Sequence, residues 1–93
     1  MTRAQCLKLA RYAARSAGFA SVAAMHAHVI TRGWQSGTSV VYFNALQCIY
    51  LHVVQPLVWA AEGTGEERAR WVRHAHKGAF LSWVTGAALR AAP

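Results

Sequence analysis

The sequence predicts a small all-α membrane protein with one transmembrane helix at about residues 38–61. Residues 33–61 contain no Asp, Glu, Lys or Arg, and residues 1–61 contain no acidic side chain at all. The chain is 55% hydrophobic and only 14% charged, whereas about 25% of the residues in an ordinary globular domain are charged. A charge at the centre of a bilayer costs roughly 2.5 to 3.5 kcal/mol, so a membrane explains this pattern.

Residues 3–31 predict one or two basic, Ala-rich helices. Lys8, Arg11 and Arg15 fall within roughly a 60° arc of a helix that starts near residue 3. This acid-free, Arg-rich segment resembles a mitochondrial import signal, and it also suits an amphipathic helix lying on anionic headgroups. Residues 17–31 would extend about 22 Å as a helix, less than the roughly 30 Å hydrocarbon core. A second, short membrane helix is the alternative interpretation.

Gly33 and Gly37 predict a turn before the span. Ser36 or Thr38 is expected to cap the helix that follows. Within that helix a bend is expected at Pro56, because proline has no N–H to donate to the carbonyl four residues earlier.

Two kinds of residue predict how the span is surrounded. Trp34 and Trp59 lie near its two ends, where indole rings favour the membrane interface. Uncharged polar side chains within the span need hydrogen-bond partners that acyl chains do not supply. We therefore expect one face of the helix to contact a partner protein through Asn44, Gln47, His52 and Gln55. A soluble amphipathic helix with this face in water is the alternative.

The last predicted element is an amphipathic helix at about residues 66–91, after a break near Gly63 and Gly65. It opens with charged residues and becomes apolar from Ala79. With a net charge of +7, the chain is suited to anionic headgroups or to an acidic partner. The residues expected to make these contacts are Lys8, Arg11, Arg15, Arg32, Arg68, Arg70 and Arg73. Residues 1–93 are expected to form a single unit.

No motif for catalysis or metal binding is present in the sequence. No two of the five histidines have the i, i+3 or i, i+4 spacing that shared metal ligation on a helix requires. No Asp accompanies the three Glu, so paired-carboxylate chemistry lacks its residues. We therefore expect neither an enzyme nor a cofactor.

A pigment- or haem-binding polypeptide is the alternative for the histidines, with His28 or His52 as the ligand. Ala24, His28 and Trp34 resemble part of a bacterial antenna polypeptide, which would imply that His28 binds chlorophyll. The acidic N-terminal region that such antennas often carry is absent.

These features together predict a non-catalytic accessory subunit of an oxidative-phosphorylation complex in the mitochondrial inner membrane, favouring a respiratory-chain complex. Its expected partners are the other subunits of a larger hetero-oligomer and anionic phospholipid, not nucleic acid or a small-molecule substrate. The alternatives are a membrane-region subunit of ATP synthase, the pigment- or haem-binding polypeptide, and a soluble basic helical module that binds nucleic acid.

Overall fold

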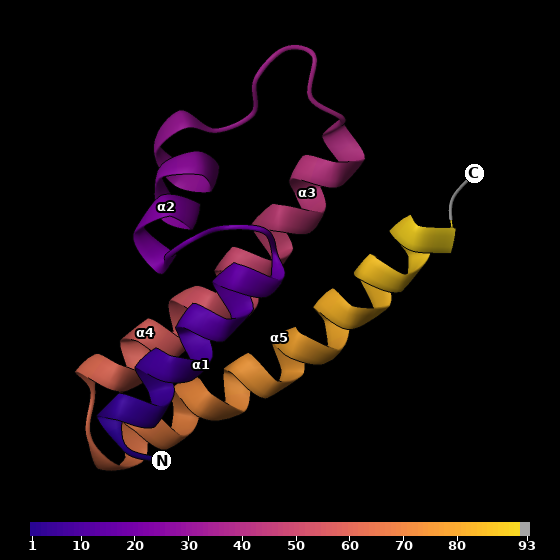
Figure 1. Cartoon of the computed structure of the whole chain (residues 1–93). Helices are drawn as coiled ribbons and strands as arrows, with labels where there is room; N and C mark the ends of the chain where they lie inside the picture. The colour runs from indigo at the N-terminus through magenta and orange to yellow at the C-terminus, as the bar shows by residue number, and fades with distance from the viewer. Residues whose placement is uncertain (92–93) are drawn as a thin grey trace.

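All regular elements that the structure describes are helices, which confirms the predicted all-α class (Figure 1). The structure is a computed structural model that describes the backbone of residues 1–91 and the side chains of residues 1–80. In chain order the elements are α1 (Arg3–Ser16), α2 (Val22–His26), the π-helical segment η1 (Ala27–Arg32), α3 (Val40–Ile49), the π-helical segment η2 (Tyr50–Val54), α4 (Gln55–Glu62) and α5 (Gly65–Ala91).

The central helix of the fold consists of α3, η2 and α4 in direct succession. It covers Val40–Glu62, 23 residues, and is long and apolar enough to cross a membrane. It starts two residues later than predicted. The side chain of Ser39 accepts a hydrogen bond from the backbone N–H of Tyr42 at 3.3 Å. The prediction of Ser36 or Thr38 as the cap was therefore wrong, because the turn runs on to residue 39 before helical geometry begins.

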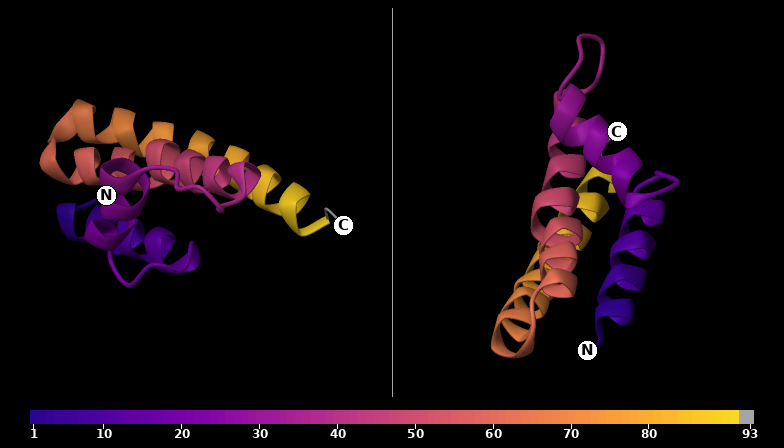
Figure 2. Two further views of the ribbon diagram at one scale, coloured as in Figure 1. Left: turned by 90° about the horizontal axis from the view of Figure 1, so that it is seen from above. Right: turned by 90° about the vertical axis from the view of Figure 1, so that its left-hand side faces the viewer.

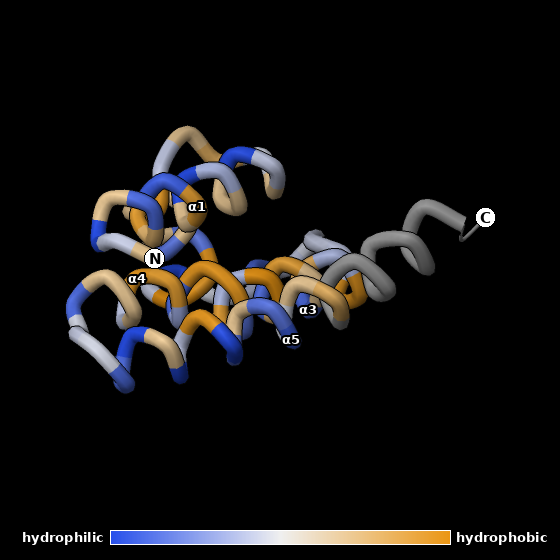
Figure 3. The backbone as a smooth tube through the Cα atoms, turned by 90° about the horizontal axis from the view of Figure 1, so that it is seen from below, coloured by the Kyte–Doolittle hydropathy of each residue, from blue (hydrophilic) through white to orange (hydrophobic). Residues whose placement is uncertain are grey.

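Two helices pack lengthwise on the central helix, both antiparallel to it (Figures 1 and 2). From α1, Cys6, Ala10 and Ala14 are completely buried against it. From α5, Ala75 is buried at the same core. Because these side chains are small, the helix backbones can approach closely. Figure 3 shows the most hydrophobic residues along the central helix and hydrophilic ones on α1 and at the start of α5.

The segment after α1 forms a separate short helical unit rather than continuing α1. The chain turns at Gly18, whose φ of 98° lies in the left-handed region that glycine tolerates. The Ser21 side chain then caps α2 by accepting the N–H of Ala24 at 3.0 Å. Met25 and Val29 enter the main core from α2 and η1. Within the described residues, only the central helix meets the length and hydropathy that a membrane span requires.

The central helix departs from α geometry immediately before Pro56. In η2 the hydrogen bonds reach five residues back, and the N–H of Gln55 donates to the carbonyl of Tyr50. An α-helix would instead direct the residue at position 56 to the carbonyl of His52, and proline has no hydrogen to donate there. The wider π turn is a common way for a helix to accommodate such an interruption.

A close approach between α5 and the central helix also involves His52. A Cβ atom built on Gly78 would overlap the carbonyl oxygen of His52 and would lie 2.6 Å from its carbonyl carbon. Since that Cβ would replace one hydrogen of glycine, a Cα–H bond of Gly78 points at the oxygen. Such Cα–H···O contacts recur at closely packed helix interfaces. Only glycine fits at this crossing.

We predict that Gly78→Ala destabilises the protein by about 2 kcal/mol, because backbone atoms of η2 would have to move. Helix propensity alone predicts the opposite sign, a gain of about 1 kcal/mol for alanine. Unfolding followed by far-UV circular dichroism in mild detergent distinguishes the two. Lys77→Ala, at the exposed neighbouring position, is the matched control and should change stability by less than about 0.5 kcal/mol. A stabilised Gly78→Ala protein would contradict the close crossing.

Candidate partner-facing surface

The outward side of the central helix is exposed and carries no charge until Glu62. Its apolar members are large and partly accessible: Val41 is 61% exposed, Leu51 40% and Trp59 39%. The opposite side holds core residues such as Leu46, Val54 and Leu57. A helix in water normally carries charged side chains on its outer face. This surface is therefore better suited to acyl chains or to another protein than to water.

The four polar residues predicted to face a partner lie outside the core, at two separate places. Asn44 and His52 are exposed, while Gln47 and Gln55 are half-buried. Within the described part of the chain, none of the four makes a side-chain hydrogen bond.

Asn44 and Gln47 line a shallow hollow beside η1 and the loop before α3, and His52 lies on the α5 side. The hollow has a volume of 610 Å³ and is otherwise mainly apolar, with Ile30 and Trp34 among the residues that line it. The ring of His52 stacks on that of His74 at 6.1 Å between centroids. The structure therefore divides the predicted face between two neighbouring elements.

The two predicted tryptophan anchors lie near opposite ends of the central helix. Trp34 is in the loop before α3, 48% exposed, and its Nε1–H donates to the carbonyl of Thr38 at 2.9 Å. Trp59 lies in α4, where its ring packs on Trp71 of α5 at 4.7 Å between centroids. Their role as interfacial anchors stays a prediction.

Most of the predicted cationic contacts are exposed, and they occupy three elements. Lys8, Arg11 and Arg15 lie on the outer face of α1, and Arg32 lies at the end of η1. Arg70 and Arg73 project from α5. Because α1 packs along η2 and α4, its three cations run beside the second half of the central helix.

Arg68 differs from the other six because its guanidinium donates hydrogen bonds to backbone carbonyls, whereas the guanidinium of Arg70 lies over the ring of Trp71 at 5.4 Å from its centroid. Its Nε–H donates to the carbonyl of Ala60 at 2.9 Å, and Nη2 donates to that of Gly63 at 2.8 Å. Longer bonds of 3.4 Å reach the carbonyls of Ala61 and Met1. The last carbonyls of a helix have no partner within that helix, and a cation also suits the negative end of its dipole. Arg68 thus caps the C-terminal end of α4.

The remaining histidines make ordinary packing contacts. The ring of His28 lies 5.3 Å from Phe19 and 6.4 Å from Phe43 between centroids. Nδ1 of His26 is hydrogen-bonded to the hydroxyl of Tyr50. Among residues with described side chains, no three of His, Cys, Asp or Glu gather as a metal site requires.

Sequence reasoning missed two residues that organise this surface, Gly78 and Trp71. Gly78 follows Ala75 by three residues, a spacing of small side chains that signals close helix packing. Trp71 gave no signal of its own, since its pairing with Trp59 depends on how α5 lies against α4. Comparisons with protein families, curated proteins and solved structures found no match to this chain.

We predict that Arg68→Gln destabilises the protein by about 2 kcal/mol, because charge-assisted bonds to the end of α4 are lost. Thermal unfolding in mild detergent measures this. Arg70→Gln is the matched control: it removes an exposed cation two positions away together with its contact to the Trp71 ring, and should cost less than about 1 kcal/mol. Equal stabilities for the two variants would mean that Arg68 does not hold α4 and α5 together.

Proposed function

We propose that this protein is a non-catalytic accessory subunit of a mitochondrial inner-membrane complex, favouring a respiratory-chain complex. In this role it braces larger subunits and contacts anionic lipid. The observation that carries the proposal is the outward side of the central helix. It is exposed and charge-free, and its polar side chains make no hydrogen bond among the residues whose side chains are described.

The distribution of charge supports a membrane assembly. The exposed side of α3 presents Val40, Val41 and Tyr42, which are 56%, 61% and 50% exposed. We place this exposed side of the central helix among acyl chains. The cations lie on the outer face of α1, so we place that face against an acidic protein surface of the complex or in the headgroup layer.

The mitochondrial part of the proposal rests on the N-terminal segment. Its acid-free, Arg-rich composition is typical of import signals, and in the structure the same segment is a helix with an exposed cationic face. We favour a respiratory-chain complex over ATP synthase because small accessory subunits are more frequent in respiratory-chain complexes, and not because of any individual residue.

Extraction of native membranes tests the location. We expect the protein to stay in the membrane pellet after alkaline carbonate or high salt and to dissolve only with detergent, because the exposed apolar surface must remain covered. Co-purification in mild detergent, followed by mass spectrometry, then identifies the complex. Release by carbonate without detergent would refute a membrane-spanning helix and favour a soluble module.

A double substitution, Asn44→Leu with His52→Leu, tests the polar groups on the partner-facing surface. We expect about a tenfold loss of co-purified partner subunits, since two interhelical hydrogen bonds are worth about 1 to 2 kcal/mol in a membrane. Carbonate resistance should be unchanged. Thr31→Leu with Ser36→Leu, at exposed polar positions outside the central helix, is the control. Unaltered assembly in the Asn44/His52 variant would show that this surface has no partner.

A further inference from the structure

We propose that an anionic diacyl phospholipid binds in a trough between α1 and α5, with its headgroup at the cationic end and an acyl chain at the apolar end. This inference rests on the proposed membrane location and adds the binding site and the class of ligand. The trough consists of three adjoining hollows, one apolar, one cationic and one that adjoins both.

The apolar hollow has a volume of 490 Å³ and lies over the central helix. Its floor is formed by Ile49, Val53 and Leu57, which recur every four residues and so face the same side. Leu9 and Tyr12 line the α1 side and remain 42% and 71% exposed. Large apolar side chains left this open are suited to a hydrocarbon chain.

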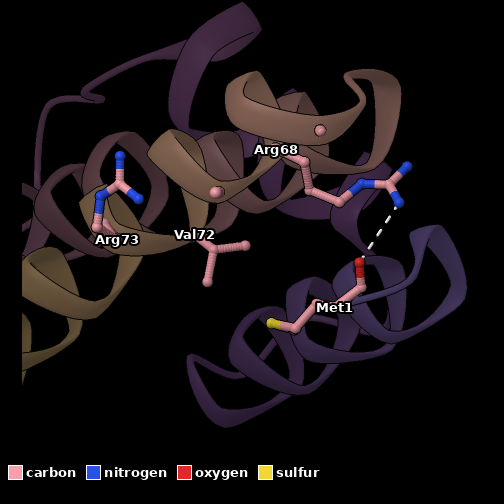
Figure 4. Close-up of a pocket in the computed structure, with 6 residues that line it drawn as sticks. Met1, Arg68, Val72 and Arg73 are labelled. Atoms are coloured by element: carbon pink, nitrogen blue, oxygen red, sulfur yellow. Dashed lines mark hydrogen bonds between the residues drawn. The ribbon is translucent and has the colours of Figure 1, made fainter.

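The cationic hollow, of 470 Å³, lies at the end of the molecule where α4 turns into α5 (Figure 4). It is lined by Met1 and by the first turns of α5, including Arg68, Val72 and Arg73. Figure 4 shows the two arginines on either side of Val72, with Arg68 directed at the carbonyl of Met1. Arg68 is occupied by carbonyls, whereas Arg73 is exposed and has no hydrogen-bond partner within the described residues.

A third hollow, on the α1 side, adjoins both ends. It is lined by Met1, which it shares with the cationic hollow, and by Leu9 and Tyr12, which it shares with the apolar one. Lys8 also lines it and is exposed. Lys8 and Arg73 therefore stand on the two helices that form the trough, and both belong to its headgroup end.

The charges lining the trough are all of one sign. No acidic residue lines any of the three hollows. Glu66 and Glu67 line a separate hollow, which Arg73 also borders together with Arg70. A guanidinium can bind a phosphate through two parallel N–H···O bonds, and an ammonium adds a point charge. An anionic phosphodiester is therefore suited to this end of the trough, where Arg73 and Lys8 line adjoining hollows.

The direction of the trough matches that of a lipid in a bilayer. Its cationic end lies where the central helix ends at Glu62. Its apolar end lies nearer the middle of the same helix, over Ile49 and Val53. A phospholipid with its headgroup at the end of a spanning helix has its tails alongside that helix. A partner helix in the trough would have to present acidic residues at one end and only apolar ones at the other.

Photocrosslinking tests the site with the detergent-purified full chain and dioleoyl phosphatidylglycerol carrying a diazirine in one acyl chain. We expect adducts on residues 9–17 and 75–79, the two walls of the apolar hollow. Lys8→Gln with Arg73→Gln should lower the adduct yield about tenfold, and the matched pair Arg11→Gln with Arg70→Gln should lower it less than twofold. The corresponding phosphatidylcholine probe should crosslink about tenfold less than phosphatidylglycerol.

A second variant, Ala79→Trp, fills the apolar end without changing charge and should abolish the adducts. Because Ala79 is exposed, the fold should tolerate this change. Equal labelling by the two lipids, or unchanged labelling in Lys8→Gln with Arg73→Gln, would overturn the proposal. Adducts confined to residues 40–51 would indicate bulk lipid only. Full competition by inorganic phosphate would indicate a phosphate site, and a partner peptide crosslinked in the trough would indicate a docked helix.

The result of the crosslinking experiment can be distinguished from the results that test the proposed function. Carbonate extraction and co-purification report on the membrane location and the complex, and neither depends on Lys8 or Arg73. A protein that stays in the membrane yet shows no selectivity for phosphatidylglycerol refutes the lipid site alone. A protein released by carbonate refutes the membrane location, whatever it binds in micelles.

Discussion

The close crossing of α5 over the central helix at Gly78 is the constraint on which the rest of this structure depends. Pro56 cannot donate to the carbonyl of His52, and the helix widens into η2 at that point. The backbone of α5 then lies directly against the same carbonyl. A larger residue at position 78 would push the two helices apart. It would thereby separate the rings of Trp59 and Trp71, which are in contact across them.

Packing at this crossing determines which surfaces remain for partners. With α1 and α5 both antiparallel to the central helix, one side of that helix is covered and the other is open (Figure 2). The open side is charge-free, while the covering helices carry the cations outward. The molecule therefore has an apolar surface and a basic surface, and the proposed function assigns acyl chains or a subunit to the first and anionic groups to the second.

Arg68 joins the ends of three elements. Its bonds to Ala60 and Gly63 close α4, and a longer one reaches Met1 ahead of α1. A residue that sequence reasoning assigned to headgroups or partners thus has its donors directed at backbone carbonyls. Arg73 and Lys8, which make no such bonds among the described residues, are left free for a phosphate.

The sequence by itself determined the all-α class and the central helix to within two residues of each end. Apolar content, absence of charge and glycine turns are local signals, because each reflects the solvent or the backbone of its own segment. Only the tertiary structure decided that Ser39 caps the helix, that Gly78 contacts His52, and that Arg68 turns inward. Those outcomes depend on which distant backbone atoms lie within reach, and neither composition nor spacing along the chain contains that distance.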